Sequence, residues 1–287
     1  MINLNTISYN SSSALRAFLE KEGLGMRKKY GQNFLINPVI RQALVQALDC
    51  NAEDAVWEIG PGLGAMTALL LERGLSVQAF EIDAGFIRVL KKIFADEKKF
   101  SLVEGDVMKT WSAQKPAQFL FGNLPYNAAA ALLADLTEKR RIFTRIVVTV
   151  QKEVALRMAA SAGSPDYSSF SVLCASAYNV KPLMVIRPAS FYPKPNVDSM
   201  GVLLEKKSSG AEQIPDVFFQ LVRALFSSRR KTIKNNLTVF LSSVFGNLQD
   251  ICPSLLSENG LTGNERAENL DIESFLLLAK SIENMRK

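Results

Sequence analysis

Short apolar runs alternate with helical patterns over the first two thirds of the chain. Runs rich in β-branched and apolar residues predict strands at residues 55–59, 76–80, 101–103, 118–121 and 142–150. Apolar positions at helical spacing between these runs predict helices at residues 66–73, 85–94, 128–136 and 153–160. This alternation indicates right-handed βαβ units, and therefore an α/β fold with a largely parallel, doubly wound sheet. Two further strand-like runs flank a proline-rich loop and predict an antiparallel hairpin at the sheet edge, at residues 183–186 and 200–204.

Two helical patterns precede this region. Apolar residues on one face predict a helix over residues 11–21, with Ser12 or Ser13 as its N-cap. A second amphipathic helix is expected over residues 38–47, because Pro38 is well suited to a first helical turn.

The composition changes after residue 206. Residues 207–210 read KSSG, which is typical of a linker, and helical patterns follow at residues 215–226, 232–241 and 272–285. We therefore expect two domains, 1–206 and 207–287, of which the second is small and all-α.

Length and composition exclude several classes of protein. With 287 residues and 48% hydrophobic content, the chain is long enough to form two cores. Since no run approaches the roughly 18 apolar residues of a membrane span, and residues 1–13 lack the features of a secretory signal, we expect a cytoplasmic protein. The net charge of +6 favours a polyanionic partner.

The chain contains no histidine and only three cysteines. Cys50, Cys174 and Cys252 lie far apart, so neither a disulfide framework nor a cysteine zinc site is indicated. Without histidine the chain lacks the commonest zinc ligand and the usual general base. We therefore expect no metal, and any catalysis has to proceed without imidazole.

A glycine-rich segment follows the first predicted strand. Residues 58–64 read EIGPGLG and open the next helix, so a ligand can approach the backbone closely there. Glu81 stands about 20 residues after Gly60, where an acid binds ribose hydroxyls in dinucleotide-binding folds. This spacing does not separate a nicotinamide dinucleotide from S-adenosylmethionine. Pro61 favours the second ligand, because it removes an N–H from a loop that would have to bind a pyrophosphate.

A carboxylate follows each of the first three predicted strands, as Glu58, Glu81 and Asp106. Because the carboxyl ends of parallel strands meet at one edge of a sheet, we expect these acids to lie near one another. Together they suit a cationic nucleoside, whose amino group, ribose diol and adenine amine all need acceptors. The alternative for Asp106, and for Asp83, is a helix N-cap.

The turn at residues 121–126 reads FGNLPY and precedes an alanine-rich helix. Pro125 fixes its own φ and biases Leu124 toward an extended conformation, so the Asn123 side-chain oxygen and the Leu124 carbonyl can converge on one amino group. Tyr126 offers a ring face beside that point. A planar base with an exocyclic amine fits such a site. The alternative is a Pro-Tyr turn in which the asparagine caps the following helix.

Several segments together resemble the ordered motif set of the bacterial small-subunit (16S) ribosomal RNA adenine N6,N6-dimethyltransferases. They are 32–35 (QNFL), 58–64 (EIGPGLG), 81–83 (EID), 105–106 (GD), 123–126 (NLPY), 151–154 (QKEV) and 191–199 (FYPKPNVDS). The resemblance runs nearly end to end, because two C-terminal segments share it, 229–232 (RRKT) and 266–270 (RAENL). Two positions depart from the pattern: Asn37, where an aspartate often stands, and Met66, where leucine is usual.

The resemblance implies a Rossmann-like class I methyltransferase sheet and an enzyme that uses S-adenosyl-L-methionine. Its reaction would place two methyl groups on N6 of each of two adjacent adenosines, in a hairpin near the 3′ end of small-subunit RNA. By correspondence, the cofactor contacts would be Asn33, Leu35, Gly60, Glu81, Asp106 and Asn123, to which the glycine loop adds Glu58 and Gly62. The residues that hold the base would be Asn123, Leu124, Pro125, Tyr126 and Phe191.

Basic residues form two groups that suit an RNA partner. One precedes the QNFL segment and the other lies in the C-terminal region: Arg27, Lys28 and Lys29, then Arg223, Arg229, Arg230 and Lys231. Each residue by itself is also compatible with a solvated surface. Together they supply the cations of a salt-sensitive RNA interface. The expected partner is small-subunit RNA or the immature small subunit, bound by a monomer and without any membrane.

Three other functions are compatible with parts of the pattern. A large-subunit RNA adenine methyltransferase of antibiotic resistance is disfavoured, because such enzymes typically have isoleucine where Leu124 stands and because segment 191–199 is long. A ribosome-assembly factor that uses methylation as a release step is compatible with the same motifs. A nicotinamide dehydrogenase is disfavoured by the absence of histidine.

Overall fold

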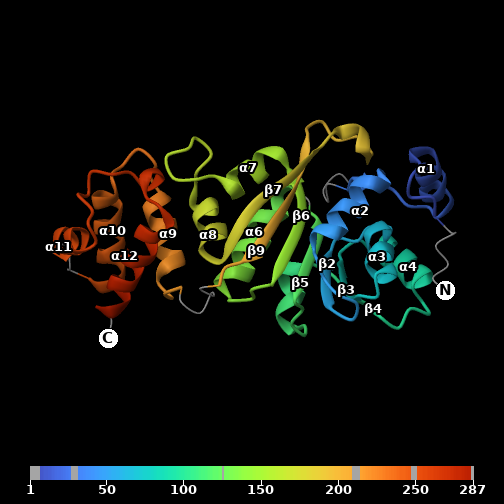
Figure 1. Cartoon of the computed structure of the whole chain (residues 1–287), viewed down its shortest axis with the longest axis horizontal. Coiled ribbons are helices and arrows are strands. Elements are labelled where there is room, and N and C mark those ends of the chain that lie inside the picture. The colour runs from blue at the N-terminus through green and yellow to red at the C-terminus, as the bar shows by residue number, and fades with distance from the viewer. Residues whose placement is uncertain (1–6, 27–31, 125, 209–213, 247–250, 286–287) are drawn as a thin grey trace. The chain divides into compact units, whose positions relative to one another are not determined.

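The computed structural model describes residues 7–26, 32–124, 126–208, 214–246 and 251–285 (Figure 1). The chain forms two compact units. The first unit comprises Met1–Asp135, Phe143–Ala155 and Lys181–Glu205, and the second comprises Leu136–Ile142, Leu156–Val180 and Lys206–Lys287. These units are clusters of contacts. The division into two domains, 1–206 and 207–287, stays a prediction.

A seven-stranded sheet with the order β4-β3-β2-β5-β6-β9-β7 confirms the predicted α/β architecture (Figure 1). Its parallel strands are β2 (Ala55–Ile59), β3 (Ser76–Glu81), β4 (Phe100–Glu104), β5 (Phe119–Asn123) and β6 (Arg145–Gln151). At one edge lie the two strands expected there, β9 (Ser199–Lys206), which is antiparallel to β6, and β7 (Tyr178–Ile186). The strand order reverses between β2 and β5, which makes their carboxyl ends a topological switch point.

Helices follow the parallel strands, and the sequence predicted all of them except the short helix and the 3-10 turn after β4. They are α3 (Ala65–Glu72), α4 (Ala84–Ile93), the short α5 (Val107–Thr110) with the 3-10 turn η3 (Trp111–Ala113), α6 (Tyr126–Glu138) and α7 (Lys152–Ala159). The central strands β2 and β6 are buried on both faces, as parallel strands covered by helices are. The main core joins the sheet to α2 (Pro38–Ala47) and α3 through residues such as Leu44, Val56, Leu70 and Val147.

Helix α2 is capped by Asn37, a residue that departs from the family pattern. The side chain of Asn37 accepts hydrogen bonds from the backbone N–H groups of Val39 (3.0 Å) and Ile40 (3.1 Å), and Pro38 occupies the first turn. Asparagine and aspartate cap helices about equally well, so the departure at this position leaves the local structure intact.

The N-terminal helix α1 (Ser12–Lys21) corrects one detail of the sequence analysis. Its N-cap is Ser11, whose side chain accepts a hydrogen bond from the N–H of Ala14 at 3.3 Å. Ser11 has the extended backbone of an N-cap (φ −126°, ψ 121°), whereas Ser12 and Ser13, the expected caps, already lie in the helix. Three adjacent serines offer equivalent side chains, so composition alone does not distinguish them.

A two-stranded antiparallel ribbon was not predicted. Strand β1 (Phe34–Leu35) pairs with β8 (Phe191–Tyr192), and in its register Leu35 lies opposite Phe191. A 3-10 turn, η4 (Pro188–Ser190), precedes β8. The ribbon therefore joins two of the segments that carry the family resemblance.

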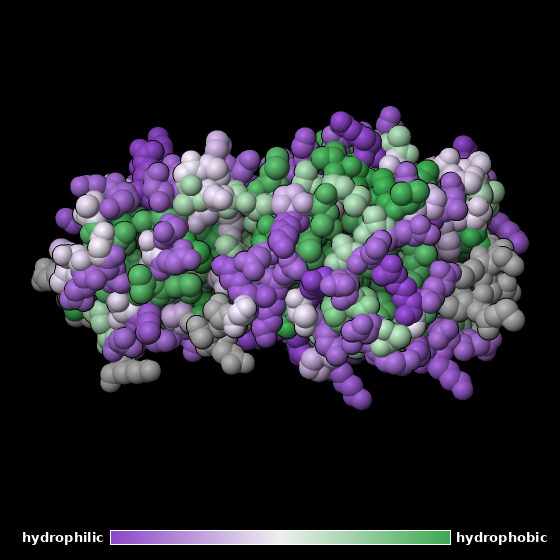
Figure 2. All heavy atoms as spheres, viewed as in Figure 1, coloured by the Kyte–Doolittle hydropathy of each residue, from purple (hydrophilic) through white to green (hydrophobic). Residues whose placement is uncertain are grey.

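The second unit is helical, and its later helices match the prediction. These are α9 (Phe218–Phe226), α10 (Ile233–Phe245) and α12 (Ile272–Asn284), with the 3-10 turn η6 (Ala267–Asn269) before the last. Helices α8 (Ser169–Ala177) and α11 (Ile251–Glu258) were not predicted. None of the helices in the described residues is long and apolar enough to cross a membrane. On the face shown in Figure 2, hydrophobic patches lie between hydrophilic ones.

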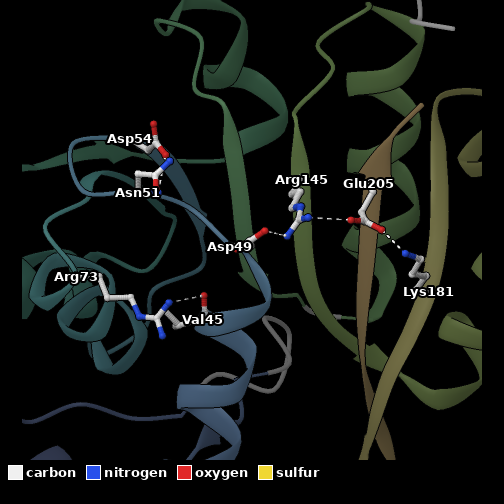
Figure 3. A network of polar contacts seen from close by, with 8 residues as sticks. All are labelled: Val45, Asp49, Asn51, Asp54, Arg73, Arg145, Lys181 and Glu205. Carbon is white, nitrogen blue, oxygen red and sulfur yellow. Dashed lines mark hydrogen bonds and ion pairs between the residues drawn. The ribbon is translucent and has the colours of Figure 1, made fainter. Parts of the chain in front are cut away.

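The amino end of β6 carries a network of ion pairs (Figure 3). Arg145 contacts Asp49 at 2.9 Å and Glu205 at 3.0 Å, and Glu205 also pairs with Lys181. Because the parallel strands share one direction, these pairs lie at the edge opposite the carboxyl ends of the strands. The ion pairs connect β6 with β9, β9 with β7, and β6 with the residues that follow α2.

Candidate functional site

The predicted site residues gather at the carboxyl ends of the parallel strands. Glu58 lies near the end of β2, where it is in register with Ala79 of β3 and with Phe121 of β5. Glu81 ends β3 and Asn123 ends β5. The sheet thus brings two of the three expected acids, Glu58 and Glu81, to the same end as the Asn123 amide.

The glycine loop after β2 has a backbone that only glycine adopts readily. Gly60 and Gly62 have positive φ angles of 69° and 59°. A Cβ atom on Gly62 would also stand 3.0 Å from a ring carbon of Phe34. The loop is therefore left-handed where the fingerprint requires glycine, and segment 32–35 lies directly against it.

Glu81 is the best-anchored acid of the site. Its Oε1 accepts from the backbone N–H groups of Ile82 (2.9 Å) and Asp83 (2.8 Å), and its Oε2 accepts from that of Gly62 (3.1 Å). The residue is 5% exposed. Burial raises the pKa of Glu81 to about 7, and the three N–H donors oppose this shift. The carboxylate is thus oriented by the backbone and retains acceptor capacity for a hydroxyl group.

Glu58 lies deeper and accepts a hydrogen bond from the hydroxyl of Thr67 on α3, at 2.6 Å. It is 2% exposed, and in the part of the chain that the structure describes neither Glu58 nor Glu81 forms an ion pair. Burial, and to a smaller extent the charge of Glu81, raises the pKa of Glu58 to about 8. Thr67 was not among the predicted site residues, because a threonine in a helical pattern carries no motif.

The two aspartates of the site act as helix caps. Asp83 accepts from the N–H of Gly85 at 2.8 Å at the start of α4, and the Gln32 side chain also donates to it, at 3.3 Å. Asp106 is half-buried and accepts from the N–H of Met108 at 3.0 Å at the start of α5. These bonds match the capping alternative. The contact of Asp106 with a cofactor stays a prediction.

Asn123 is held by one of the other predicted cofactor residues. Its Nδ2 donates to the backbone carbonyl of Asn33 at 2.8 Å. Since a carbonyl oxygen can only accept, this bond fixes the orientation of the amide and leaves Oδ1 as an acceptor. Leu124 follows with its N–H bonded to the carbonyl of Thr149 on β6 at 3.1 Å. Pro125 lies outside the described residues, and Tyr126 begins α6 with a side chain that the structure does not describe.

Phe191 is a core residue. It is 4% exposed and belongs to the same hydrophobic cluster as Leu35, its partner in the β1–β8 ribbon. Leu35 is likewise buried, and its carbonyl accepts a hydrogen bond from Arg41 at 2.7 Å, so its predicted contact with a ligand would fall on its backbone. The predicted contact between Phe191 and a base stays a prediction.

The basic residues of the second unit differ in their surroundings. Arg223 is paired with Glu138, and Arg229 is paired with Glu268 at 3.1 Å. Arg230 and Lys231 are exposed, and within the described ranges neither forms an ion pair. Arg27, Lys28 and Lys29 lie outside the described residues.

The fold and this site define a methyltransferase architecture. The structure is similar to a dimethyladenosine transferase from Plasmodium falciparum, with a TM-score of 0.75 and 27% identity over 86% of this chain and 96% of that chain. It also shares its fold with the 23S rRNA methyltransferase ErmE, with a TM-score of 0.62 and 18% identity over 86% of this chain and 98% of that one.

The sequence places the chain in a particular family. The family model described as ribosomal RNA adenine dimethylase matches residues 23–284, so the chain belongs to this family. It is 46% identical to a ribosomal RNA small subunit methyltransferase A of Treponema denticola, with 97% of each chain covered. It is 41% identical to the protein of that name from Treponema pallidum, over 96% of this chain and 97% of the relative.

The buried acids predict how stability depends on pH in the ligand-free protein. The pKa values of Glu58 and Glu81 lie at about 8 and about 7, above the usual 4.5. The folded protein therefore holds these protons more tightly, and the free energy of unfolding should fall as the pH rises from about 4.5 to about 8. Glu58→Gln should flatten this dependence by a few kcal/mol, an order-of-magnitude value that follows from about 1.4 kcal/mol per pKa unit.

Urea unfolding at several pH values between 5 and 9 measures this effect. The matched control is Glu104→Gln, which removes an exposed carboxylate from the end of β4. The control should keep the wild-type dependence. A Glu58→Gln protein that loses stability with rising pH as steeply as the wild type would contradict the assignment.

Proposed function

We propose that this protein is an S-adenosyl-L-methionine-dependent ribosomal RNA adenine-N6 dimethyltransferase of the small subunit. The observation that carries the proposal is the Asn123-Leu124 turn, which lies at the switch point beside the glycine loop in a chain of the adenine dimethylase family. The names of the Treponema relatives, at 41% and 46% identity, support the small subunit as the source of the substrate. The likeness to ErmE concerns the fold alone.

The residues at the strand ends suit the cofactor. S-adenosylmethionine supplies an electrophilic methyl group on a positively charged sulfur. Glu81, oriented by three backbone donors, is placed to accept from ribose hydroxyls. Gly60 has open space where a side chain would stand, so a ligand can approach the backbone closely there. The buried acids Glu58 and Glu81 have no cationic partner among the described residues, so a ligand that brings positive charge favours their ionised forms.

The turn after β5 orients the reacting amine. The lone pair of adenine N6 is delocalised into the ring, so the amine is a poor nucleophile until its nitrogen becomes more tetrahedral. Acceptors at the Asn123 Oδ1 and at the Leu124 carbonyl favour that geometry and stabilise the positive charge that develops on nitrogen. The product ammonium is acidic and loses its proton afterwards. No general base is therefore required, in agreement with a chain that lacks histidine.

Aromatic residues would hold the flipped base. We propose that Tyr126 stacks on it, a type of contact worth about 1 to 3 kcal/mol. For Phe191, its place in the core favours the alternative of a core aromatic that keeps the β1–β8 ribbon in position. Pro125 keeps its proposed part, which is to bias Leu124 toward an extended backbone.

We propose that RNA is bound by basic residues that precede and follow the cofactor motifs in the sequence. We propose that residues 207–287 form a helical domain that contacts RNA or the immature small subunit in the cytoplasm. Arg230 and Lys231 are exposed and available to phosphate. Arg223 and Arg229 would have to leave their carboxylate partners in order to bind phosphate. A monomeric enzyme is sufficient for this function.

The direct test of the function is a methylation assay. The protein is incubated with labelled S-adenosylmethionine and immature small subunits, and the modified nucleotides are mapped. We expect N6,N6-dimethyladenosine at two adjacent positions near the 3′ end of the RNA. Label in large-subunit RNA alone would favour the alternative large-subunit enzyme. A catalytically inactive variant that still bound particles and blocked their maturation would favour a role in assembly.

Replacement of Asn123 tests the proposed chemistry. Asn123→Ala should lower the single-turnover rate about 100-fold or more, because it removes an acceptor at the point where charge develops. Saturating cofactor is needed, since Asn123 also holds the Asn33 segment. The control is Asn51→Ala, an exposed asparagine at the opposite edge of the sheet. A wild-type single-turnover rate in Asn123→Ala would show that this turn does not drive the reaction.

Asp106→Asn separates a cofactor contact from a helix cap. Asparagine caps about as well as aspartate, so the melting temperature should not change. If Asp106 accepts from the cofactor, the dissociation constant in calorimetry should rise about tenfold, as for the loss of a charge-assisted hydrogen bond. Glu81→Gln should weaken binding at least as much. Unchanged affinity in Asp106→Asn would assign Asp106 to capping alone.

The basic residues of the second unit are tested by salt dependence. If Arg229, Arg230 and Lys231 contact phosphates, replacement of all three by glutamine should flatten the slope of log affinity against log salt by roughly 2 to 3 units for a duplex-like RNA. Cofactor affinity should stay the same. An unchanged slope would indicate a solvated surface.

A matched control removes the same charge from elsewhere. Lys91, Lys92 and Lys98 are exposed lysines of the first unit, at the end of α4 and in the loop that follows. Their replacement by glutamine should leave the salt slope nearly unchanged. Equal effects of the two triple variants would mean that net charge, and not a particular surface, governs RNA binding.

A further inference from the structure

The N-terminal segment, residues 7–22, packs against both loops of the proposed cofactor site. Its buried residues Ile7, Leu15 and Leu19 share a small hydrophobic core with Leu63 of the glycine loop. Phe34, which lies over Gly62, packs against the same core. This core is distinct from the main core, although Ile93 packs against both. The segment therefore bridges the glycine loop and the 32–35 segment, and we call it the strap.

A buried arginine holds the strap. Arg41 of α2 is 5% exposed, and its Nη1 donates to the carbonyl of Leu35 at 2.7 Å and to that of Tyr9 at 3.2 Å. Its Nη2 donates to the Asn10 side chain. One guanidinium thus joins the strap to the backbone of a residue expected to contact the cofactor.

The partners of Arg41 are all uncharged. Within the described residues it pairs with no carboxylate, and its buried Nε has no hydrogen-bond partner. Burial accordingly lowers the pKa of the guanidinium. A buried charge without a counter-ion is costly, and an apolar side chain of similar size would stabilise a core better. The arrangement is therefore poorly suited to stability alone and well suited to the positioning of carbonyl groups.

Tyr9 completes the connection. Its hydroxyl donates to the carbonyl of Leu63 at 2.9 Å, while its own carbonyl accepts from Arg41. Burial raises the pKa of Tyr9, so the hydroxyl remains a donor at physiological pH. A single strap residue is thus bonded to the glycine loop through its side chain and, by way of Arg41, to Leu35.

We infer that the strap clamps the two cofactor-binding segments, with Arg41 and Tyr9 as positioning residues for S-adenosylmethionine. The inference rests on the proposed function. Because the strap bonds to the loops, its effect should fall on affinity and residence time, and the methyl-transfer step should be spared. The coupling has to be reciprocal, so a cofactor that binds more tightly to the clamped form must in turn order the strap.

The experiment uses Tyr9→Phe and Arg41→Met in the full chain. Each change removes polar contacts and keeps most of the apolar volume. Tyr9→Phe removes one hydrogen bond, and Arg41→Met removes three, of which one reaches Leu35. We expect the dissociation constant for S-adenosylmethionine in calorimetry to rise roughly three- to tenfold, the scale of one lost hydrogen bond. Single-turnover rates at saturating cofactor should stay near wild type. The matched control is Arg73→Met, since Arg73 also donates to a backbone carbonyl, that of Val45, away from the strap (Figure 3).

Amide hydrogen exchange on the wild-type protein provides a measurement that needs no variant. Cofactor should slow exchange in residues 12–22, with little change in α10 of the second unit. Unchanged strap exchange, or unchanged affinity in a folded Tyr9→Phe protein, would overturn the clamp. A wild-type protein that does not bind S-adenosylmethionine would instead overturn the proposed function.

Discussion

Three backbone N–H groups converge on the carboxylate of Glu81, and the rest of the site depends on this arrangement. Two of them belong to the residues that follow β3, and the third, from Gly62, joins that strand end to the glycine loop after β2. The carboxylate is therefore oriented in the free protein. The hydrogen bond from Gly62 to Glu81 also holds the loop in its left-handed conformation. The pairing of β2 with β3 therefore positions both the loop and the carboxylate. Acceptors that are oriented in advance lose little entropy when a ligand binds.

The burial that orients the acids also limits their charge. Glu58 and Glu81 stand at the ends of adjacent strands, and their pKa values are raised to about 8 and about 7. Two buried anions would repel each other, so the free protein favours a protonated form near neutral pH. A ligand that carries positive charge reverses this balance. The buried acids thus lower the stability of the free protein near neutral pH and favour the binding of cations. Perturbed pKa values of this kind are common at functional sites.

Sequence patterns predict the elements whose signals are local. Strand 55–59, the glycine loop and the acids at the strand ends are found where expected because each depends on neighbouring residues and on strand direction. The β1–β8 ribbon was missed, since a two-residue strand has no periodicity and Leu35 meets Phe191 only in the folded chain. Arg41 was missed for a similar reason: in an amphipathic helix an arginine is expected on the polar face, and its burial depends on carbonyls from distant segments.

Methyl transfer to an amine does not require a general base, and this agrees with a chain without histidine. The reaction needs an amine with the right geometry more than it needs a base, because the proton leaves after the methyl group has been transferred. Orientation is what the β5–β6 pairing provides: the N–H of Leu124 is bonded to Thr149, and the amide of Asn123 is fixed by the carbonyl of Asn33. The proposed acceptors at this turn are thus positioned by the sheet and by the hydrogen bond to Asn33, and catalysis by geometry would make the rigidity of the turn part of the mechanism.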